Sequence, residues 1–436
     1  MRFYDRESEL EMLDGIKQRA SEKGQMTVLV GRRRIGKTRL IQKSLENDKY
    51  LYFFIAKKDE KLLCNEFLED IRETLDIKPF GAIESFKSLF EFLLDASTRT
   101  SFSLVIDEFQ EFYRINPSVY SDMQNLWDQY KDRSRMNLIL CGSIYSLMTK
   151  IFENIKEPLF GRANEIIRLK PFKTKVIKQI FIDNNKTAKN KDLLALYIFT
   201  GGVAKYLEYF VDIKAISFDS MKNALLSENS LLLNEGKSIL IEEFGKDYTT
   251  YFSILSLIAS SKTSRAEIES ILEKNVGGYI DRLEKEYSII KKHKPIFAKE
   301  NSRVQKYYIE DNFLNFWFRF IFKYRSAVEI GNFNYLKNII DRDFDTFSGP
   351  FLEKYFRQKF EESGEYSLVG NYWEKGNNNE IDLVAVDEFN KQAIIAEVKL
   401  NKDKINLQRL EEKSVKLLQN LRGYEIEYKA LSVEDM

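Results

Sequence analysis

The stretch VLVGRRRIGKTRLI, residues Val28–Ile41, joins a short apolar run, a glycine-rich turn and the start of an amphipathic segment. Its centre, Gly31–Thr38, has the spacing G-x4-G-K-[ST]. Glycine permits backbone conformations that a β-carbon forbids, so the loop amides and the following helix N-terminus can point at phosphate oxygens. The stretch therefore predicts a strand, a phosphate-binding loop and a helix.

Each residue type in this loop has a physical role. We expect Lys37 to reach the β- and γ-phosphates of ATP, and the Thr38 hydroxyl to ligate Mg²⁺. The alternative, a glycine turn that happens to precede a lysine, is disfavoured by the strand–loop–helix context. The predicted nucleotide-binding residues are Gly31, Arg32, Arg33, Arg34, Ile35, Gly36, Lys37, Thr38 and Arg39.

Apolar runs alternate with amphipathic segments on both sides of the loop. The runs MTVLVG, YLYFFIA, SFSLVIDEF and MNLILCGS read as strands, with helical patterns between them. Strands that are apolar throughout and alternate with helices are typical of a parallel sheet covered on both faces. The first half of the chain is therefore predicted to be α/β, with a P-loop NTPase sheet and a helical lid.

Two later strand ends supply the rest of the predicted site. In LVIDEFQEF, Asp107 can hold the magnesium shell and Glu108 can polarise the attacking water. In LILCGS, Ser143 can contact the γ-phosphate or the water, although a serine that caps a helix would look the same. The strand ends therefore predict catalytic roles for Asp107, Glu108 and Ser143 beside Lys37.

An arginine and a pair of glycines complete the first half. Arg162 lies in the turn of EPLFGRANEI and could act as an arginine finger, in cis or across a subunit boundary in a homo-oligomer. A surface salt bridge is the alternative role of Arg162. In TGGVAKYLEYF, Gly201 and Gly202 are expected to end one helix, with Lys205 at the start of the next.

Composition limits the classes of function. Of 436 residues, 68 are basic and 67 acidic, so any contact with nucleic acid must rest on local patches. Two cysteines and one histidine exclude a Cys/His metal cluster and a disulfide framework, which favours a reduced, cytoplasmic setting. No segment has the ~20 apolar residues that span a bilayer, so no membrane partner is expected.

The motifs FYDRESELEML, VLVGRRRIGKTRLI, LVIDEFQEF, PLFGR and TGGVAKYLE together resemble the archaeal-type ATPase family, in the STAND branch of P-loop ATPases related to AAA+ proteins. The resemblance covers residues 1–245 and implies ATP hydrolysis. It also implies that Asp5–Glu9 packs by the adenine, and that Arg162 and Gly201–Lys205 lie near the nucleotide. Ala204 stands where the resemblance leads us to expect proline.

The middle of the chain, residues 246–310, predicts a winged helix: three short helical patterns and a hairpin. In a DNA-binding version the third helix would be the recognition element, and Lys291, Lys292 and Lys294 would lie on the wing. The third helix carries both acidic and basic residues, which favours docking of a protein partner over DNA. An aromatic helical linker, residues 311–345, is expected to pack in the core through Phe313, Phe316, Trp317 and Phe320.

The last segment, residues 346–436, predicts an αβββα unit with a long helix from about Asp403. The stretch Asn379–Leu400 holds two strands of this unit. If the four residues Glu388–Lys391 connect them, Asp382 lies across from Glu397 and Glu380 across from Lys399. A slip of one residue would separate these pairs.

Two adjacent carboxylates repel each other unless a cation lies between them. A metal ion shared by Asp382 and Glu397 would supply that charge and generate hydroxide, while Lys399 would position it. This Asp…Glu-x-Lys arrangement resembles the PD-(D/E)xK, or restriction-endonuclease-like, fold, in particular the C-terminal domain that often follows this ATPase. The resemblance implies an active site of Glu353, Asp382, Glu397 and Lys399, with Glu380 as a helper and Mg²⁺ or Mn²⁺ as the metal.

Two functions follow from these predictions. In the first, an ATP-binding and ATP-hydrolysing switch controls a metal-dependent nuclease-like domain that acts on DNA or RNA. In the second, the chain is a nucleotide-gated signalling or scaffold ATPase whose C-terminal domain binds partners without cleavage.

Overall fold

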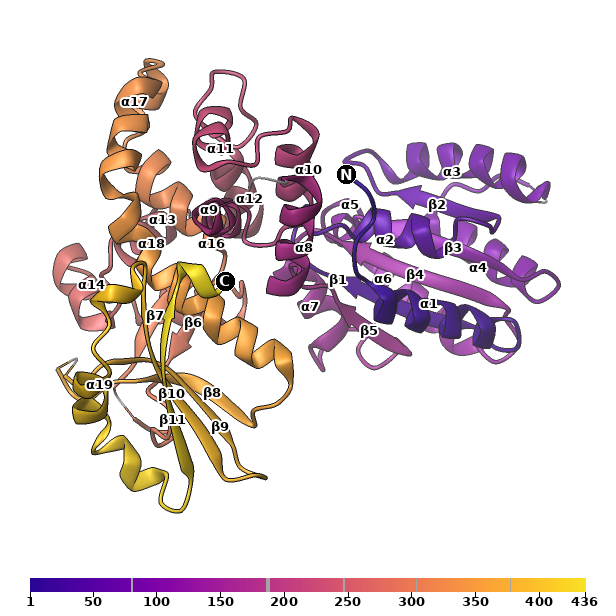
Figure 1. Ribbon diagram of the computed structural model, residues 1–436. Coiled ribbons are helices and arrows are strands. Elements are labelled where there is room, and N and C mark those ends of the chain that lie inside the picture. Colours follow the sequence, from indigo (N-terminus) through magenta and orange to yellow (C-terminus); the bar gives the residue numbers. More distant parts are fainter. Residues whose placement is uncertain (80, 186–188, 246–247, 303, 377) are drawn as a thin grey trace. The chain divides into compact units, whose positions relative to one another are not determined.

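The computed structural model describes residues 1–79, 81–185, 189–245, 248–302, 304–376 and 378–436. The chain forms two compact units: Asp5–Lys170, and Met1–Tyr4 together with Pro171–Met436 (Figure 1). The predicted division at residues 245, 310 and 345 is finer than this and stays a prediction. The two units are described separately below.

The first unit is built on a parallel sheet of five strands in the order β2-β3-β4-β1-β5. Along one central strand, Val28 and Val30 belong to one apolar cluster, and Leu29 between them is also fully buried. Successive side chains of a strand point to opposite faces, so both faces of the sheet are covered, as predicted. The strands are β1 Gln25–Val30, β2 Tyr50–Phe54, β3 Phe102–Asp107, β4 Met136–Gly142 and β5 Glu165–Arg168.

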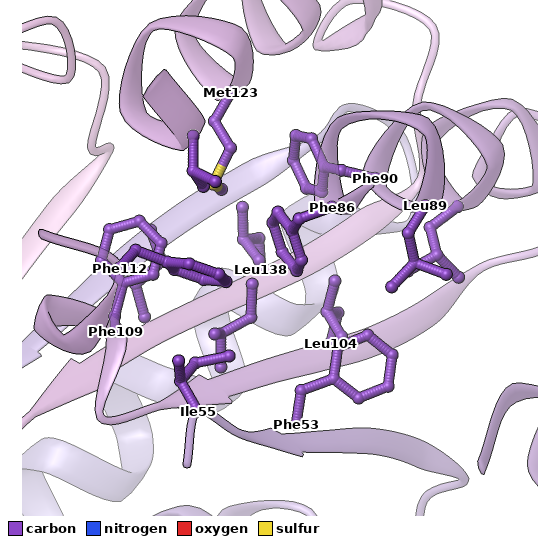
Figure 2. Packing of buried hydrophobic residues seen from close by; sticks show 14 of the residues in the cluster. Phe53, Ile55, Phe86, Leu89, Phe90, Leu104, Phe109, Phe112, Met123 and Leu138 are labelled. Carbon is purple, nitrogen blue, oxygen red and sulfur yellow. The ribbon is translucent and has the colours of Figure 1, made fainter. Parts of the chain in front are cut away.

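Aromatic packing fixes the chain just beyond the end of β3. Phe109 comes directly after the Asp107–Glu108 pair and Phe112 three residues later, and both side chains are fully buried. Figure 2 shows them in one cluster with Phe86 of α4, and the rings of Phe86 and Phe112 lie 4.6 Å apart. The helices of this unit are α1 Glu7–Ala20, α2 Lys37–Ser44, α3 Glu60–Leu75, α4 Phe86–Ser97, α5 Phe112–Ile115, α6 Ser118–Tyr130 and α7 Tyr145–Glu153.

The second unit opens with a group of helices in which α9 is central. Every residue of α9 from Leu193 to Thr200 is buried, and the helix ends at Gly201, whose φ of 56° is left-handed. The next helix begins at Ala204 and contains Lys205, so both predicted boundaries are confirmed. The helices are α8 Thr174–Asn184, α9 Asn190–Thr200, α10 Ala204–Asp212, α11 Phe218–Leu225 and α12 Glu235–Phe244.

Three helices and an antiparallel hairpin follow, in the order that the sequence predicts for a winged helix. They are α13 Tyr248–Ala259, α14 Arg265–Leu272, α15 Gly277–Lys285, β6 Ile290–His293 and β7 Lys306–Ile309. α14 begins at a capping box, in which Ser264 and Glu267 bond to each other's backbone amides.

The aromatic segment after β7 forms α16 Asn312–Phe316, a π-helical turn Trp317–Phe322 and α17 Arg325–Glu329. Phe313, Phe316, Trp317 and Phe320 are all buried, which confirms their predicted place in the core. The Trp317 ring lies directly over Gly236 of α12: a β-carbon on this glycine would fall 2.4 Å from the ring.

A single helix, α18 Phe333–Ser363, runs for 31 residues into the C-terminal part. It is followed by a mixed sheet in the order β11-β10-β9-β8. Three strands are antiparallel neighbours, and β11 is parallel to β10. The strands are β8 Leu368–Tyr372, β9 Ile381–Asp387, β10 Gln392–Lys399 and β11 Glu425–Ser432.

The predicted long helix from about Asp403 is wrong. Helix α19 spans only Leu407–Ser414, and Asn406 caps its start. A short 3-10 turn, Leu417–Asn420, and Gly423, at a φ of 82°, then lead into β11. The unit is therefore αβββαβ instead of αβββα. Within the described ranges, no helix is long and apolar enough to cross a membrane.

Candidate functional site

The phosphate-binding loop has the backbone that its two glycines allow. Gly36 lies at a φ of 101° immediately before α2, a conformation that L side chains rarely adopt. At Gly31 a β-carbon would lie 2.9 Å from the carbonyl oxygen of Leu169. The sequence motif therefore meets two separate steric requirements, one of conformation and one of space.

Lys37 is buried at the first position of α2, and its Nζ donates to the carbonyl oxygens of Gly31, at 2.6 Å, and Arg32, at 3.1 Å. These bonds hold the ammonium at the loop itself. A positive charge at this place suits the phosphate oxygens of a nucleotide.

Asp107 lies at the end of β3 and accepts hydrogen bonds on both carboxylate oxygens. The backbone amide of Glu108 and the Cys141 thiol donate to Oδ1, at 2.9 and 3.1 Å, and the Tyr52 hydroxyl donates to Oδ2. Burial raises the pKa of the Cys141 thiol well above its usual range, so the thiol stays a donor. Asp107 is therefore held from both neighbouring strands, β2 and β4, and by the amide of the next residue.

Tyr52 lies on β2, the strand beside β3. Burial and the Asp107 carboxylate raise the pKa of this phenol far above its usual range, so it is neutral. Sequence reasoning missed Tyr52, because its role depends on β2 lying beside β3, a strand order that the sequence does not state. A polar tip in the apolar run YLYFFIA was the only signal.

Glu108 and Ser143, predicted from separate strand ends, are in direct contact. The Ser143 hydroxyl donates to Glu108 Oε2 at 2.7 Å, its amide donates at 3.3 Å, and Gln110 donates to the same oxygen. The helix α7 begins after Ile144, so the alternative role of Ser143 as a helix cap is wrong. The serine instead positions the glutamate.

Arg162 forms the surface salt bridge that was its alternative role. One guanidinium nitrogen lies 3.2 Å from Asp128 Oδ2 on α6, and another donates to the Phe160 carbonyl at 2.9 Å. Its action as an arginine finger stays a prediction, as does the position of Gly201–Lys205 near the nucleotide.

The residues at this site fit a nucleotide with Mg²⁺. Thr38 in the first turn of α2 and Asp107 at the end of β3 both carry oxygen donors, which Mg²⁺ prefers. When bound, the metal would neutralise charge on the phosphates.

The C-terminal site depends on the register of β9 and β10, and the predicted register is confirmed. Asp387 pairs with Gln392, the connection is residues 388–391, and the pairing continues to Leu383 opposite Ala396. Asp382 and Glu397 are the next residues of each strand.

One ammonium group contacts both of these carboxylates. Lys399 Nζ lies 3.1 Å from Asp382 Oδ2 and 3.2 Å from Glu397 Oε1. The same Asp382 oxygen accepts the Val398 amide at 2.8 Å. The two carboxylates are therefore near enough to share one cation, here the Lys399 ammonium.

Glu353 of α18 completes the predicted set from a different element. It lies 3.7 Å from Arg357, one helical turn further on. Burial and the Asp382 charge raise the pKa of Glu353 to about 8, and burial also raises the pKa of Asp382. Arg357 donates to the Asp382 carbonyl at 3.3 Å, which ties α18 to β9.

Glu380 has a different partner from the one predicted. It precedes β9, and its carboxylate lies 2.9 Å from Lys306 Nζ on β7, whereas Lys399 contacts Asp382 and Glu397. Lys413 of α19 is a member that sequence reasoning missed. It donates to both oxygens of Glu397, at 3.0 and 3.2 Å.

No group of three or more His, Cys, Asp or Glu side chains in the described part of the chain has the geometry to hold a metal ion. In the C-terminal site the carboxylates are instead paired with the cations Arg357, Lys399 and Lys413. The candidate metal ligands therefore remain the pair Asp382 and Glu397.

The parallel sheet and the loop Gly31–Thr38 define a P-loop ATPase. Residues 3–210 match the family described as an ATPase domain predominantly from Archaea, and residues 317–416 match archaeal and bacterial proteins of unknown function. The uncharacterized protein MJECL04 of Methanocaldococcus jannaschii is 31% identical over 407 residues, which cover 91% of this chain and 87% of that protein. The chain therefore belongs to this family of archaeal-type ATPases, and it is a nucleotide-binding ATPase.

A solved structure resembles the chain in fold. The Walker-type ATPase PABY2304 of Pyrococcus abyssi has a TM-score of 0.55 and 19% identity, over 72% of this chain and 96% of that one. The ORC2 protein of Aeropyrum pernix has a TM-score of 0.49 and 14% identity, over 75% of this chain and 96% of that one.

Proposed function

We propose that this ATPase is a switch that controls a metal-dependent, nuclease-like site acting on DNA or RNA. The observation that carries the proposal is the single ammonium of Lys399 between Asp382 and Glu397. A carboxylate pair of this kind, with Asp382 buried, Glu397 partly buried and both near enough to share one cation, is an arrangement suited to metal-assisted hydrolysis. Mg²⁺ or Mn²⁺ would polarise a phosphodiester there.

In the ATPase half, Lys37 is the phosphate-binding cation and Thr38 the metal-binding hydroxyl. Asp107 holds the metal shell, and Glu108 accepts a proton from the attacking water. Ser143 orients Glu108 through the bond at 2.7 Å. Each of these groups acts on charge that develops during phosphoryl transfer.

In the C-terminal half, Asp382 and Glu397 would hold the metal, and Lys399 would position the nucleophile beside it. Glu353 has its pKa raised to about 8 and can hold or release a proton near neutral pH. Arg357 and Lys413 would add positive charge for a phosphate backbone. In this proposal Arg357 and Lys413, which pair with carboxylates in the structure, would face the nucleic-acid substrate.

The winged-helix segment supports a protein partner over DNA. Lys292 on the wing lies 3.7 Å from Glu284 of α15, so part of the wing's charge is neutralised by the helix that would enter the groove. Asp281 adds a further acid to α15. Nucleic acid would then be contacted by the C-terminal site, and a homo-oligomer would be needed only if Arg162 acts in trans.

The alternative is a signalling or scaffold ATPase that cuts nothing. The observation that favours it is the pairing of each acidic side chain of the C-terminal site with a basic side chain of the same chain. Such a cluster can be stable without a metal, and it would then serve packing or partner binding.

Plasmid nicking with Mg²⁺ or Mn²⁺, with and without ATP, separates the two functions. Wild-type cleavage that depends on ATP and is lost in Asp382→Asn supports the switch. Glu427→Gln is a matched control, because this carboxylate lies on the neighbouring strand β11 and is 62% exposed. A preparation that hydrolyses ATP but neither binds nor cuts nucleic acid with any metal refutes the nuclease role.

The ATPase assignment has its own test. Lys37→Ala should abolish ATP hydrolysis, because it removes the ammonium group that is bonded to the Gly31 and Arg32 carbonyls of this loop. Lys43→Ala is the control on the same helix, since Lys43 is exposed and paired with Glu46. Hydrolysis by Lys37→Ala at the wild-type rate would defeat the assignment.

A further inference from the structure

One phenol contacts the carboxylate that is expected to hold the magnesium shell at the ATPase site. The Tyr52 hydroxyl donates to Oδ2 of Asp107. The two residues come from neighbouring strands, β2 and β3. The P-loop motif contains Thr38 and the strand end contains Asp107, but neither pattern specifies a tyrosine.

The direction of this hydrogen bond follows from the groups themselves. An ionised carboxylate only accepts, and a tyrosine hydroxyl has one hydrogen. Tyr52 therefore gives its hydrogen to Asp107.

The number of hydrogen bonds that each oxygen accepts distinguishes the two carboxylate oxygens of Asp107. Oδ1 accepts from the Glu108 amide and the Cys141 thiol, which together use the two acceptor positions of a carboxylate oxygen. Oδ2 accepts from Tyr52 and keeps one position. Oδ2 is therefore the oxygen of Asp107 that can accept a hydrogen bond from a metal-bound water.

We propose that Tyr52 is a positioning residue for Mg²⁺ in the ATPase site. Its hydroxyl occupies one lone pair of Asp107 Oδ2 and holds the carboxylate in one orientation, so that this oxygen is presented to the metal shell. Partners of metal ligands that set their orientation in this way typically contribute a factor of ~10–100 in metal affinity. Tyr52 does not touch the nucleotide's reacting atoms in this role.

The strand offers a matched control. Tyr50 is the same residue type, two positions earlier on β2, on the same face by strand alternation, and it is also half-buried. Tyr52 pairs with Val105 and Tyr50 with Ser103, so only Tyr52 reaches the strand end that carries Asp107. Tyr50→Phe and Tyr52→Phe each remove one oxygen atom and leave the ring in place.

The test measures metal affinity directly. Binding of a non-hydrolysable ATP analogue to the full chain is followed by calorimetry across a Mg²⁺ titration and again in EDTA. Tyr52→Phe should need about tenfold more Mg²⁺ for half-maximal binding, with unchanged affinity in EDTA, while Tyr50→Phe behaves like wild type. The Mg²⁺ dependence of ATP hydrolysis should shift by the same factor.

Two results would overturn the proposal. One is a Mg²⁺ dependence of Tyr52→Phe equal to that of wild type. The other is an equal loss of nucleotide affinity with and without Mg²⁺, which would make Tyr52 a packing residue of β2. If Tyr52→Phe is less stable than wild type, metal binding is measured instead by the rise in unfolding temperature when Mg²⁺ is added to nucleotide-saturated protein. The proposal requires this rise to be smaller in Tyr52→Phe than in wild type.

Discussion

The hydroxyl of Ser143, at the end of β4, donates to Oε2 of Glu108, just beyond the end of β3, over 2.7 Å. Glu108 is itself at a φ of 55°, a left-handed conformation that is uncommon for a residue with a side chain. The backbone conformation of Glu108 therefore sets the direction of the carboxylate that would activate water, and Ser143 holds that carboxylate in place.

Removing either partner should affect turnover more than binding. Glu108→Gln should lower kcat for ATP about 10²–10⁴-fold with little change in nucleotide affinity, because the lost group acts on the attacking water. Ser143→Ala should lower kcat less, since Gln110 still donates to the same oxygen, and Ser143→Thr should retain activity. Steady-state kinetics with a separate binding assay measure both effects; a pure KM effect in Ser143→Ala would contradict the arrangement.

Gly236 should not tolerate a methyl group. A β-carbon there would lie 2.4 Å from the Trp317 ring, so Gly236→Ala should lower the free energy of unfolding by about 1–3 kcal/mol. Gly278 of α15 is the control: a β-carbon there meets nothing within 4 Å, and Gly278→Ala should raise stability by about 0.5–1 kcal/mol through helix propensity. Urea unfolding measures both, and similar effects in the two variants would argue against the tight contact.

His293 should make the protein less stable as the pH falls below neutrality. Burial lowers the pKa of this imidazole, with Arg357 and Lys291 acting in the same direction and Glu310, 3.7 Å from Nε2, opposing them. The unfolded chain therefore takes up a proton near pH 6.5 that the folded chain does not, and folding stability is lost as pH falls through this range.

The variant His293→Gln lacks this titration. Its unfolding temperature should fall less than that of wild type between pH 7.5 and 5.5, as measured by differential scanning calorimetry. Glu310, whose pKa is lowered to about 2, loses its contribution only at more acid pH, so it does not obscure the comparison. A parallel fall in both proteins would show that His293 is not the cause.

Lys413 should compete with a metal at the proposed C-terminal site. Its ammonium contacts both oxygens of Glu397, so Lys413→Ala should release this carboxylate and strengthen Mn²⁺ binding severalfold in nucleotide-free protein. Lys416→Ala is the control, since Lys416 is 65% exposed and pairs with Glu374. Calorimetric titration with Mn²⁺ measures the change, and weaker binding in Lys413→Ala would assign the lysine to holding the site together.

The parts of the sites that the sequence predicted are those set by local geometry. The loop Gly31–Thr38 follows from the conformations that glycine allows, and the pairing of Asp387 with Gln392 follows from a four-residue connection. Tyr52 and Lys413 reach their sites through the order of strands and the docking of a helix. Neither the order of strands nor the docking of a helix can be predicted from residue spacing.

Strand β11 and helix α18 also depend on contacts with distant parts of the chain, which the sequence pattern does not reveal. Along β11 the exposed positions carry charged residues, and its support comes from parallel pairing with β10, a distant partner along the chain. The sequence predicts a long helix from about Asp403 in this part of the chain and no fourth strand. α18 continues through Pro350 because packing on several elements stabilises it despite the lost backbone bond.

Helix α18 is long enough to carry side chains that contact two separate parts of the second unit, helix α9 and the C-terminal carboxylate site. Tyr355 packs edge-on against Tyr197 of α9, Gln358 accepts a bond from the same tyrosine, and Glu353 and Arg357 face the carboxylate site. A shift of this helix by one residue turns its side chains by about 100°. Any rotation that removed Glu353 from Asp382 would also break the contacts with α9, so the acidic site and the helix that ends at Gly201 must change together or not at all.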